Sequence, residues 1–270
     1  MSKMEFKNTR TFNFEGALRG MRNPLNSWAK SDSAYGIGDF DDIAADIDDA
    51  MFLYNQETPF QNDEEEELLN SYLWGNARNY SDNDWNEYAV IGPKDMNLAK
   101  RLIAGGSEHR KFLRQIFVSV DITAPLYIWK EFDTYKLGTT ANSPSTMHKL
   151  ASTPITLDCF ETDDYDDSIT YCYPNVEGST LDMSVGAFAE DLITDLEALR
   201  QKYLETKDKR YWKELVRWLP NGWLQTRTWT ANYEVLRTMY HQRKGHKLTE
   251  WAAFCEWVET LPYAKEFIID

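Results

Sequence analysis

The residues best suited to chemistry lie between Ala124 and Ser145. An apolar run starts at Ala124-Pro125 and changes into a charged and aromatic cluster that ends at Lys136, and a polar loop with Asn142 and Ser145 follows. A buried strand or helix start that leads into polar groups in this way delivers them to the mouth of a pocket. We therefore expect the chemistry of this chain at this segment.

A second group of candidate residues lies in the C-terminal third. Arg217 stands just before Leu219-Pro220, the stretch 226–232 (TRTWTAN) follows, and Arg243 comes shortly before His246. A lone arginine is more often part of a surface ion pair than of a site, and a lone histidine is more often structural. The order and spacing of the two groups are therefore more informative than any single residue.

Together the two groups resemble the signature regions of the flavin-dependent thymidylate synthases, over residues 107–150 and 216–251. The family has an Ala-Pro run, then a Gln-x-x-Arg-His-Arg cluster, then an Asn-Glu-x-Ser-Gly-Arg loop. Here Glu131 stands at the glutamine and Thr134-Tyr135-Lys136 stand at the triplet. His109 occupies the place of the histidine that the family has before the Ala-Pro run.

The resemblance implies an α+β fold: one domain over residues 1–270, with a mixed or antiparallel sheet flanked by helices and a helical C-terminal third. It also implies an enzyme, a methyltransferase that converts dUMP to dTMP by reductive methylation. Its cofactors would be methylenetetrahydrofolate, reduced FAD and NADPH, and a cofactor that carries the difficult chemistry leaves positioning and electrostatics to the protein. Members of this family are homotetramers whose active sites are assembled from several subunits.

The resemblance assigns roles by position, and no metal is expected. The expected catalytic residues are His109 and Ser145; the substrate-binding residues are Glu131, Ser145, Arg217 and Arg243; and the cofactor-binding residues are Tyr135, Lys136, Asn142 and Asn232. Two guanidinium groups from two helices can bind a phosphate through charge-assisted bonds, and a serine hydroxyl could donate to the same phosphate. A carboxylate could accept from the N3-H of uracil.

Departures from the signature keep alternatives open. Thr134 and Tyr135 replace an arginine and a histidine, Met147 replaces the arginine of the loop, and Glu234 stands where the family has a flavin-facing arginine. Each lost guanidinium removes a charge-assisted bond worth roughly 1.5–3 kcal/mol, and Glu234 is expected to add repulsion. The alternatives are a non-catalytic nucleotide-binding or assembly protein that has lost FAD binding, and an enzyme that modifies another pyrimidine nucleotide.

Composition bounds the class of protein. With 42% hydrophobic and 14% aromatic residues, the 270-residue chain is expected to fold. A net charge of -15 disfavours nucleic acid and anionic membranes as partners, because these need a basic surface, whereas one or two arginines suffice for a free nucleotide. No transmembrane run or secretory start is present, so we expect a cytoplasmic protein. The cysteines are expected to be free thiols: Cys159, Cys172 and Cys255.

The elements that position these residues follow from periodicity. We expect a helix between Gly92-Pro93 and Gly105-Gly106, a strand over 117–122, and a long loop or two short strands over 152–180. The remaining segments are predicted from their apolar spacing: helices over 188–205, 209–218 and 226–242, and one that starts at Thr249 as N-cap and runs through Trp257. The acidic segment at about 39–84 is expected to be an insertion with a solvated surface.

Overall fold

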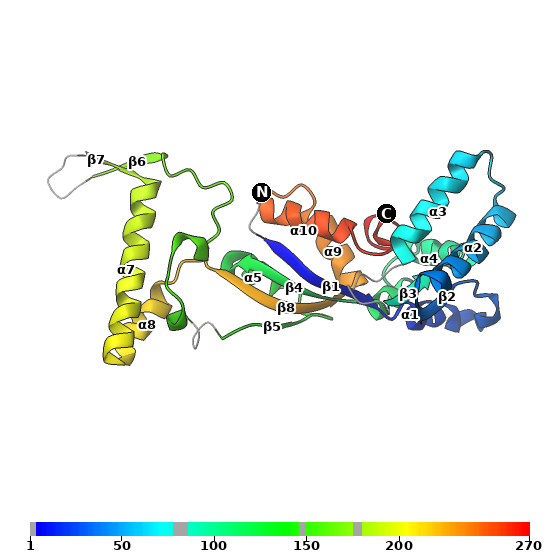
Figure 1. The fold of residues 1–270 in the computed structure, drawn as a ribbon, viewed down its shortest axis with the longest axis horizontal. Coiled ribbons are helices and arrows are strands. Elements are labelled where there is room, and N and C mark those ends of the chain that lie inside the picture. Colours follow the sequence, from blue (N-terminus) through cyan, green and yellow to red (C-terminus); the bar gives the residue numbers. More distant parts are fainter. Residues whose placement is uncertain (1–3, 78–85, 146–149, 175–179) are drawn as a thin grey trace. The chain divides into compact units, whose positions relative to one another are not determined.

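A computed structural model describes residues 4–77, 86–145, 150–174 and 180–270. Two compact units are distinguished by their internal contacts. Unit 1 comprises Met1–Glu5, Ile122–Thr134 and Asn142–Arg227, and unit 2 comprises Phe6–Asp121, Tyr135–Ala141 and Thr228–Asp270. A single domain over the whole chain stays a prediction. The α+β class is confirmed, because antiparallel strand pairs are combined with flanking helices (Figure 1).

The largest sheet has four strands in the order β1-β4-β8-β5. The strands are β1 (Glu5–Phe12), β4 (Phe117–Pro125), β5 (Thr140–Asn142) and β8 (Leu224–Asn232). Along β4 every second side chain is buried, which is the period-2 pattern that predicted a strand here. Strand β4 ends at the Ala-Pro pair, and α5 (Leu126–Phe132) begins directly after it. The candidate segment is therefore held by a buried strand and the helix that follows it.

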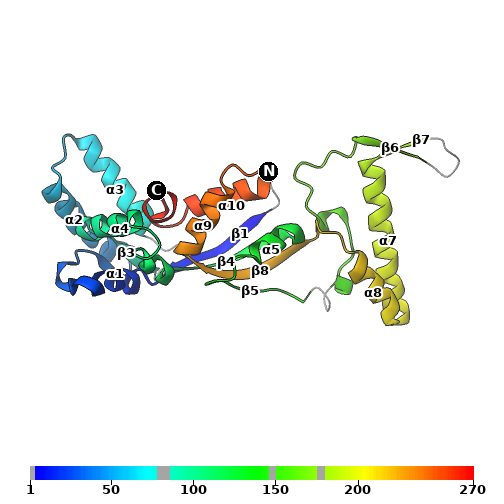
Figure 2. The same cartoon turned by 180° about the vertical axis from the view of Figure 1, so that it is seen from behind.

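Most of the helices belong to unit 2. In chain order they are α1 (Phe14–Arg22), α2 (Phe40–Glu57), α3 (Asp63–Ala77), α4 (Pro93–Ala104), α9 (Tyr233–Arg243) and α10 (Thr249–Glu259), followed by a π-helical turn at Lys265–Ile269. Three short 3-10 turns lie at Asn23–Leu25, Trp28–Lys30 and Lys111–Gln115. Helix α10 lies beside β1 in both views (Figures 1 and 2), and the Trp257 ring stacks on Phe6 with centroids 4.7 Å apart.

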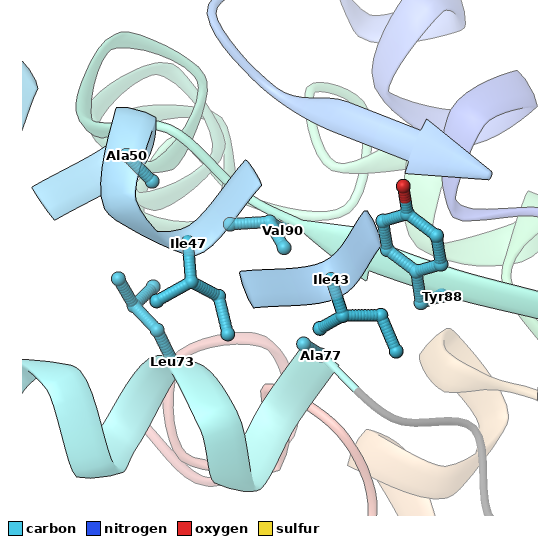
Figure 3. Packing of buried hydrophobic residues seen from close by; sticks show 7 residues of the cluster. All are labelled: Ile43, Ile47, Ala50, Leu73, Ala77, Tyr88 and Val90. Carbon is cyan, nitrogen blue, oxygen red and sulfur yellow. The ribbon is translucent and has the colours of Figure 1, made fainter. Parts of the chain in front are cut away.

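The acidic segment folds as a helical hairpin on its own small sheet. Strands β2 (Ala34–Gly38) and β3 (Asn86–Val90) pair antiparallel, and α2 and α3 pack against them. Figure 3 shows their shared core, in which buried side chains of α2 and α3 meet those of β3: Ile43, Ile47, Ala50, Leu73, Ala77, Tyr88 and Val90. Asp39 caps α2 through a reciprocal capping box with Asp42. One face of the α2–α3 hairpin is therefore buried in this core.

Unit 1 contains a second pair of helices. Its further elements are the 3-10 turns Leu150–Ser152 and Leu157–Cys159, the antiparallel strands β6 (Thr170–Pro174) and β7 (Thr180–Ser184), and the helices α7 (Val185–Thr206) and α8 (Lys209–Trp218). Buried side chains join α7 and α8 to the turns: Leu150, Ile155, Phe160, Leu196 and Leu215. The two short strands were one of the two expectations for this region.

Two element predictions were wrong. Residues 226–232 belong to strand β8 and not to a helix that runs to Gln242, and only the part from Tyr233 onward is helical. Alternating threonines with aromatic and apolar residues favour a strand by their period, although a helix follows directly. The N-cap position of α10 is Leu248, and Thr249 is the first helical residue.

The remaining expectations concern membrane-spanning helices, metal ligands and free cysteines. No helix in the described ranges is long and apolar enough to cross a membrane. Among the same residues, no group of three or more His, Cys, Asp or Glu side chains is placed to hold a metal ion. Cys159 and Cys255 are free thiols.

Candidate functional site

The best-ordered arrangement of predicted site residues is an arginine held between aromatic rings in unit 2. The Arg243 Nε donates to the Tyr135 hydroxyl at 3.0 Å, and that hydroxyl donates to Gln242 Oε1 at 2.8 Å. The Arg243 guanidinium carbon lies 4.4 Å from the centre of the Trp251 ring and 5.7 Å from that of Tyr135. Cation–π contacts of this kind fix the plane of a guanidinium. Arg243 and Tyr135, predicted separately, are therefore in direct contact.

The chain from Tyr135 to Gly138 runs along α9 and adds two more predicted residues. Gly138 has a φ of +79°, and a Cβ there would lie 2.3 Å from the Asn232 amide nitrogen, so glycine permits the close approach. Asn232 is 5% exposed, and its Oδ1 accepts from the Val235 N–H as the cap of α9. Lys136 lies between them and is exposed. Tyr135, Lys136, Asn232 and Arg243 are thus brought to one helix.

Glu234 does not bring an uncompensated negative charge to unit 2. Its two carboxylate oxygens accept from the Arg110 Nε at 3.1 and 2.9 Å, and the two side chains are only 13% and 22% exposed. Burial lowers the pKa of nearby Arg237, and the charge of Arg110 lowers it further. The repulsion expected from Glu234 is therefore offset by a guanidinium that comes from a different segment.

His109 precedes Arg110 in the turn after α4. Its ring packs over Gly105, with atoms 3.2–3.3 Å from where a Cβ of that glycine would lie, and the residue is exposed. Among the described residues its side chain makes no hydrogen bond or ion pair that joins it to the Tyr135–Arg243 pair. A catalytic role for His109 stays a prediction.

In unit 1 a second stacked arginine follows the Ala-Pro run. The Arg227 guanidinium carbon lies 4.3 Å from the centre of the Trp129 ring, its Nη1 pairs with Asp133 at 3.0 Å, and its Nε donates to Gln225 Oε1 at 2.8 Å. The Trp129 Nε1 donates to the Gln225 carbonyl at 2.8 Å. These bonds tie the end of α5 to the start of β8, so the charged cluster is held in a defined conformation.

The other predicted residues of unit 1 are solvent-facing. Glu131 is exposed on α5, Asn142 is exposed at the end of β5, and Ser145 is exposed in the loop after it. Arg217 on α8 forms an ion pair with Glu214 and is 49% exposed. Arg217 and Arg243 belong to different units, so their joint hold on one phosphate stays a prediction. Met147 lies outside the described residues.

Several residues of these arrangements were not among the expected site residues, including Arg110, Arg227 and Trp251. Arg110 pairs with Glu234, 124 positions away, only through the tertiary fold, so this pairing had no signal in the sequence. Trp251 likewise had no signal, because it meets Arg243 only through the packing of α10 on α9.

Comparison with known proteins supports the fold. No family model and no curated protein matches the sequence. Thymidylate synthase X from Helicobacter pylori, with FAD and dUMP, aligns with 100% of this chain and 98% of its own chain, at 12% identity and a TM-score of 0.54. The fold resembles that of the flavin-dependent thymidylate synthases.

Two further structures align over less of the chain. Another structure of the Helicobacter pylori enzyme with FAD and dUMP covers 70% of this chain and 85% of its own, at 16% identity and a TM-score of 0.46. A UMP/dUMP methylase, PolB from Streptomyces cacaoi bound with 5-Br UMP, covers 65% and 82%, at 14% identity and a TM-score of 0.46. The full-length alignment with the first of these structures confirms, at the level of the fold, the resemblance inferred from the motifs.

Proposed function

We propose that the chain is a divergent enzyme of the flavin-dependent thymidylate synthase type, which methylates dUMP reductively to dTMP. The observation that carries this proposal is the Arg243 guanidinium, held by Tyr135 and Trp251 in a chain that has this fold over its full length. A guanidinium whose plane is fixed loses little freedom when it binds a phosphate. The substrate would be a pyrimidine nucleotide in a cytoplasmic, homotetrameric enzyme.

The residues around α9 fit the phosphates and the planar ring of FAD. Lys136 offers an exposed ammonium, and Tyr135 offers an aromatic ring beside it. Arg110, whose Nε pairs with Glu234, offsets the negative charge at the position that resembles the flavin-facing arginine. When bound, FAD would supply the hydride, with NADPH as its reductant and methylenetetrahydrofolate as the one-carbon donor. Asn232 would support this site mainly as the cap of α9.

The chain's own residues would position the nucleotide. Arg243 and Arg217 would bind the phosphate, Ser145 would donate its hydroxyl to the same group, and Glu131 would accept from the N3-H of uracil. His109, which is exposed in the turn after α4, would be a catalytic residue that contacts the substrate. Positioning of this kind can supply several kcal/mol of the barrier reduction, about 7–11 kcal/mol in the best cases.

The second candidate is a nucleotide-binding or assembly protein that no longer holds FAD, or an enzyme for another pyrimidine nucleotide. The observation that favours it is the use of the Tyr135 hydroxyl: this group is bonded to Arg243 and Gln242 in the place of a charged signature residue. A phenol stacks on a base or a flavin but brings no positive charge to a phosphate.

The deciding experiment is the visible absorption spectrum of the purified protein before and after incubation with FAD and gel filtration, followed by calorimetric titration with dUMP. Retained flavin together with dUMP binding that is lost in Arg243→Ala supports the enzyme. The matched control is Arg101→Ala, an exposed arginine of α4. Binding of dUMP by a protein that holds no flavin would favour the second candidate. If Arg243→Ala still binds both flavin and dUMP, Arg243 is not part of the site.

A further inference from the structure

The hairpin of α2 and α3 has a groove that none of the proposed chemistry uses. Its core face packs on β2 and β3, and the groove adjoins that face through Met51, with a cavity volume of about 580 Å³. The apolar part of its lining is Met51, Phe52 and Phe60. Phe52 is 63% exposed and Phe60 is half-buried. Exposed aromatic side chains that gather in a groove are typical of a protein-interaction site.

The polar part of the lining is strongly acidic. Asp48, Asp63, Glu66 and Glu67 contribute four exposed carboxylates, and the other lining residues are asparagines. No Lys, Arg or His lines the groove among the described residues. Residues 39–77 contain twelve Asp and Glu and no basic residue, in a chain of net charge -15. Most of the excess negative charge of the whole chain is therefore carried by this hairpin.

Hydrogen bonds fix the connection between the two helices and with it the groove. The Phe60 N–H donates to Asn55 Oδ1 at 2.9 Å, and the Gln61 N–H donates to Glu65 Oε2 at 2.9 Å. The Glu65 N–H donates to Asn62 Oδ1 at 3.0 Å, which caps the start of α3. The groove is thus formed before any partner arrives, and preformed sites avoid part of the ordering cost of binding.

We propose that this groove binds a basic amphipathic helix of a partner protein. Such a helix places apolar side chains against Met51, Phe52 and Phe60 and its lysines or arginines beside the carboxylates, which is the helix-in-groove mode of recognition. The charge pattern discriminates between partners. Nucleic acid and acidic peptides are repelled by the four carboxylates, whereas a basic helix is attracted and oriented by them. The groove does not depend on any residue of the proposed enzyme site.

The test uses the full-length protein and a fluorescein-labelled synthetic helix of 18 residues, the length of α2, with leucines on one face and lysines on the other. Fluorescence anisotropy is measured at low and at physiological salt. We expect binding that weakens with salt, because the rim charges are exposed. Phe52→Ala should weaken binding about tenfold, as expected for an aromatic residue at the centre of an interface.

A matched pair of triple variants separates the groove from the general charge of the hairpin. Asp48→Asn/Glu66→Gln/Glu67→Gln removes three lining carboxylates and should weaken binding roughly tenfold or more. Asp49→Asn/Glu57→Gln/Glu64→Gln removes three carboxylates of the hairpin outside the lining and should stay within about twofold. All six side chains are exposed, so both variants should fold, which circular dichroism verifies.

Three results would overturn the proposal. Equal loss in the two triple variants would mean attraction by net charge alone, without a groove. If Phe52→Ala binds the labelled helix with unchanged affinity, Phe52 does not contact the helix. Self-association of the wild-type protein in sedimentation velocity that disappears in Phe52→Ala would make a second copy of this chain the occupant. The proposal of a basic amphipathic helix as the partner is supported if a monodisperse protein binds the labelled helix tightly and only the groove variants lose this binding.

Discussion

Tyr135 stands where the family signature has a histidine, and its side chain orients Arg243. Its hydroxyl accepts from the Arg243 Nε and donates to Gln242, so both polar functions of the phenol are used. The contact joins residues 108 positions apart. The positions of Tyr135 and Arg243 in the motifs predicted that each belongs to a site, but the bond between them depends on the tertiary fold and had no signal in the sequence.

Removal of this hydroxyl tests the arrangement at the residue scale. Tyr135→Phe keeps the ring and deletes the acceptor of Arg243, so we expect dUMP affinity to fall by roughly 2–10-fold, the worth of one hydrogen bond. The melting temperature should change little, because Tyr135 is only half-buried. Calorimetric titration measures the affinity, with Tyr165→Phe as the control tyrosine. Unchanged dUMP affinity would show that Tyr135 does not orient Arg243 for the nucleotide.

Element boundaries were predictable where local chemistry marks them. Helix α8 runs from Lys209 to Trp218 as predicted, because Asp208 caps its start and Leu219-Pro220 ends it. Residues 226–232 were misassigned because the helical spacing of the residues from Tyr233 onward was extended back over them, although their own period of two favours a strand. The strand was therefore accessible from the sequence, whereas its place between β4 and β5 depends on the tertiary fold.

The start of α4 depends on a buried carboxylate. Asp95 is fully buried and accepts from the Arg22 Nε at 2.5 Å, and its other oxygen accepts from the hydroxyls of Ser31 and Ser33. Asp95→Asn leaves Arg22, itself 4% exposed, without its counter-charge. We expect a loss of about 3–5 kcal/mol in the free energy of unfolding. Urea denaturation measures it, and the exposed Asp49→Asn should change stability by less than about 0.5 kcal/mol. Equal stability of the two variants would contradict this account.

Helix α7 carries an ion pair with a defined pH window. Hydrogen bonds from Arg200 lower the pKa of Glu197 from 4.5 to about 2, so folding favours the ionised carboxylate. This stabilisation is complete above pH 4.5 and is lost as the pH falls toward 2. Glu197→Gln should cost about 1–3 kcal/mol at neutral pH. The difference from wild type should shrink across that window in thermal melts at several pH values; a constant difference would assign the loss to packing.

At the scale of the whole molecule, charge is distributed unevenly. The net charge of -15 is concentrated in residues 39–77, while the candidate residues beside α9 include the cations Lys136 and Arg243. A locally basic site can hold a phosphate within an acidic protein, because electrostatic interactions fall off within about 10 Å at moderate salt. The acidic hairpin and the proposed nucleotide site are therefore compatible in one chain.

The last prediction concerns the assembly. In the family that the chain resembles, active sites combine residues of several subunits, and here Arg217 and Arg243 lie in different units. If one phosphate is bound by Arg217 of one subunit and Arg243 of another, two inactive variants should complement each other. We expect Arg217→Ala and Arg243→Ala to lose dUMP binding when separate.

Co-expressed at equal amounts, the same two variants should restore roughly one quarter of the sites, because random mixing pairs the two intact arginines that often in a symmetric oligomer. Calorimetric titration counts the sites, and light scattering gives the mass against the 31.5 kDa of one chain. Two results would contradict a shared active site: a monomeric mass, or a mixture of the variants that binds no more dUMP than each variant alone. Either result would mean that the two arginines act within a single chain or lie outside the site.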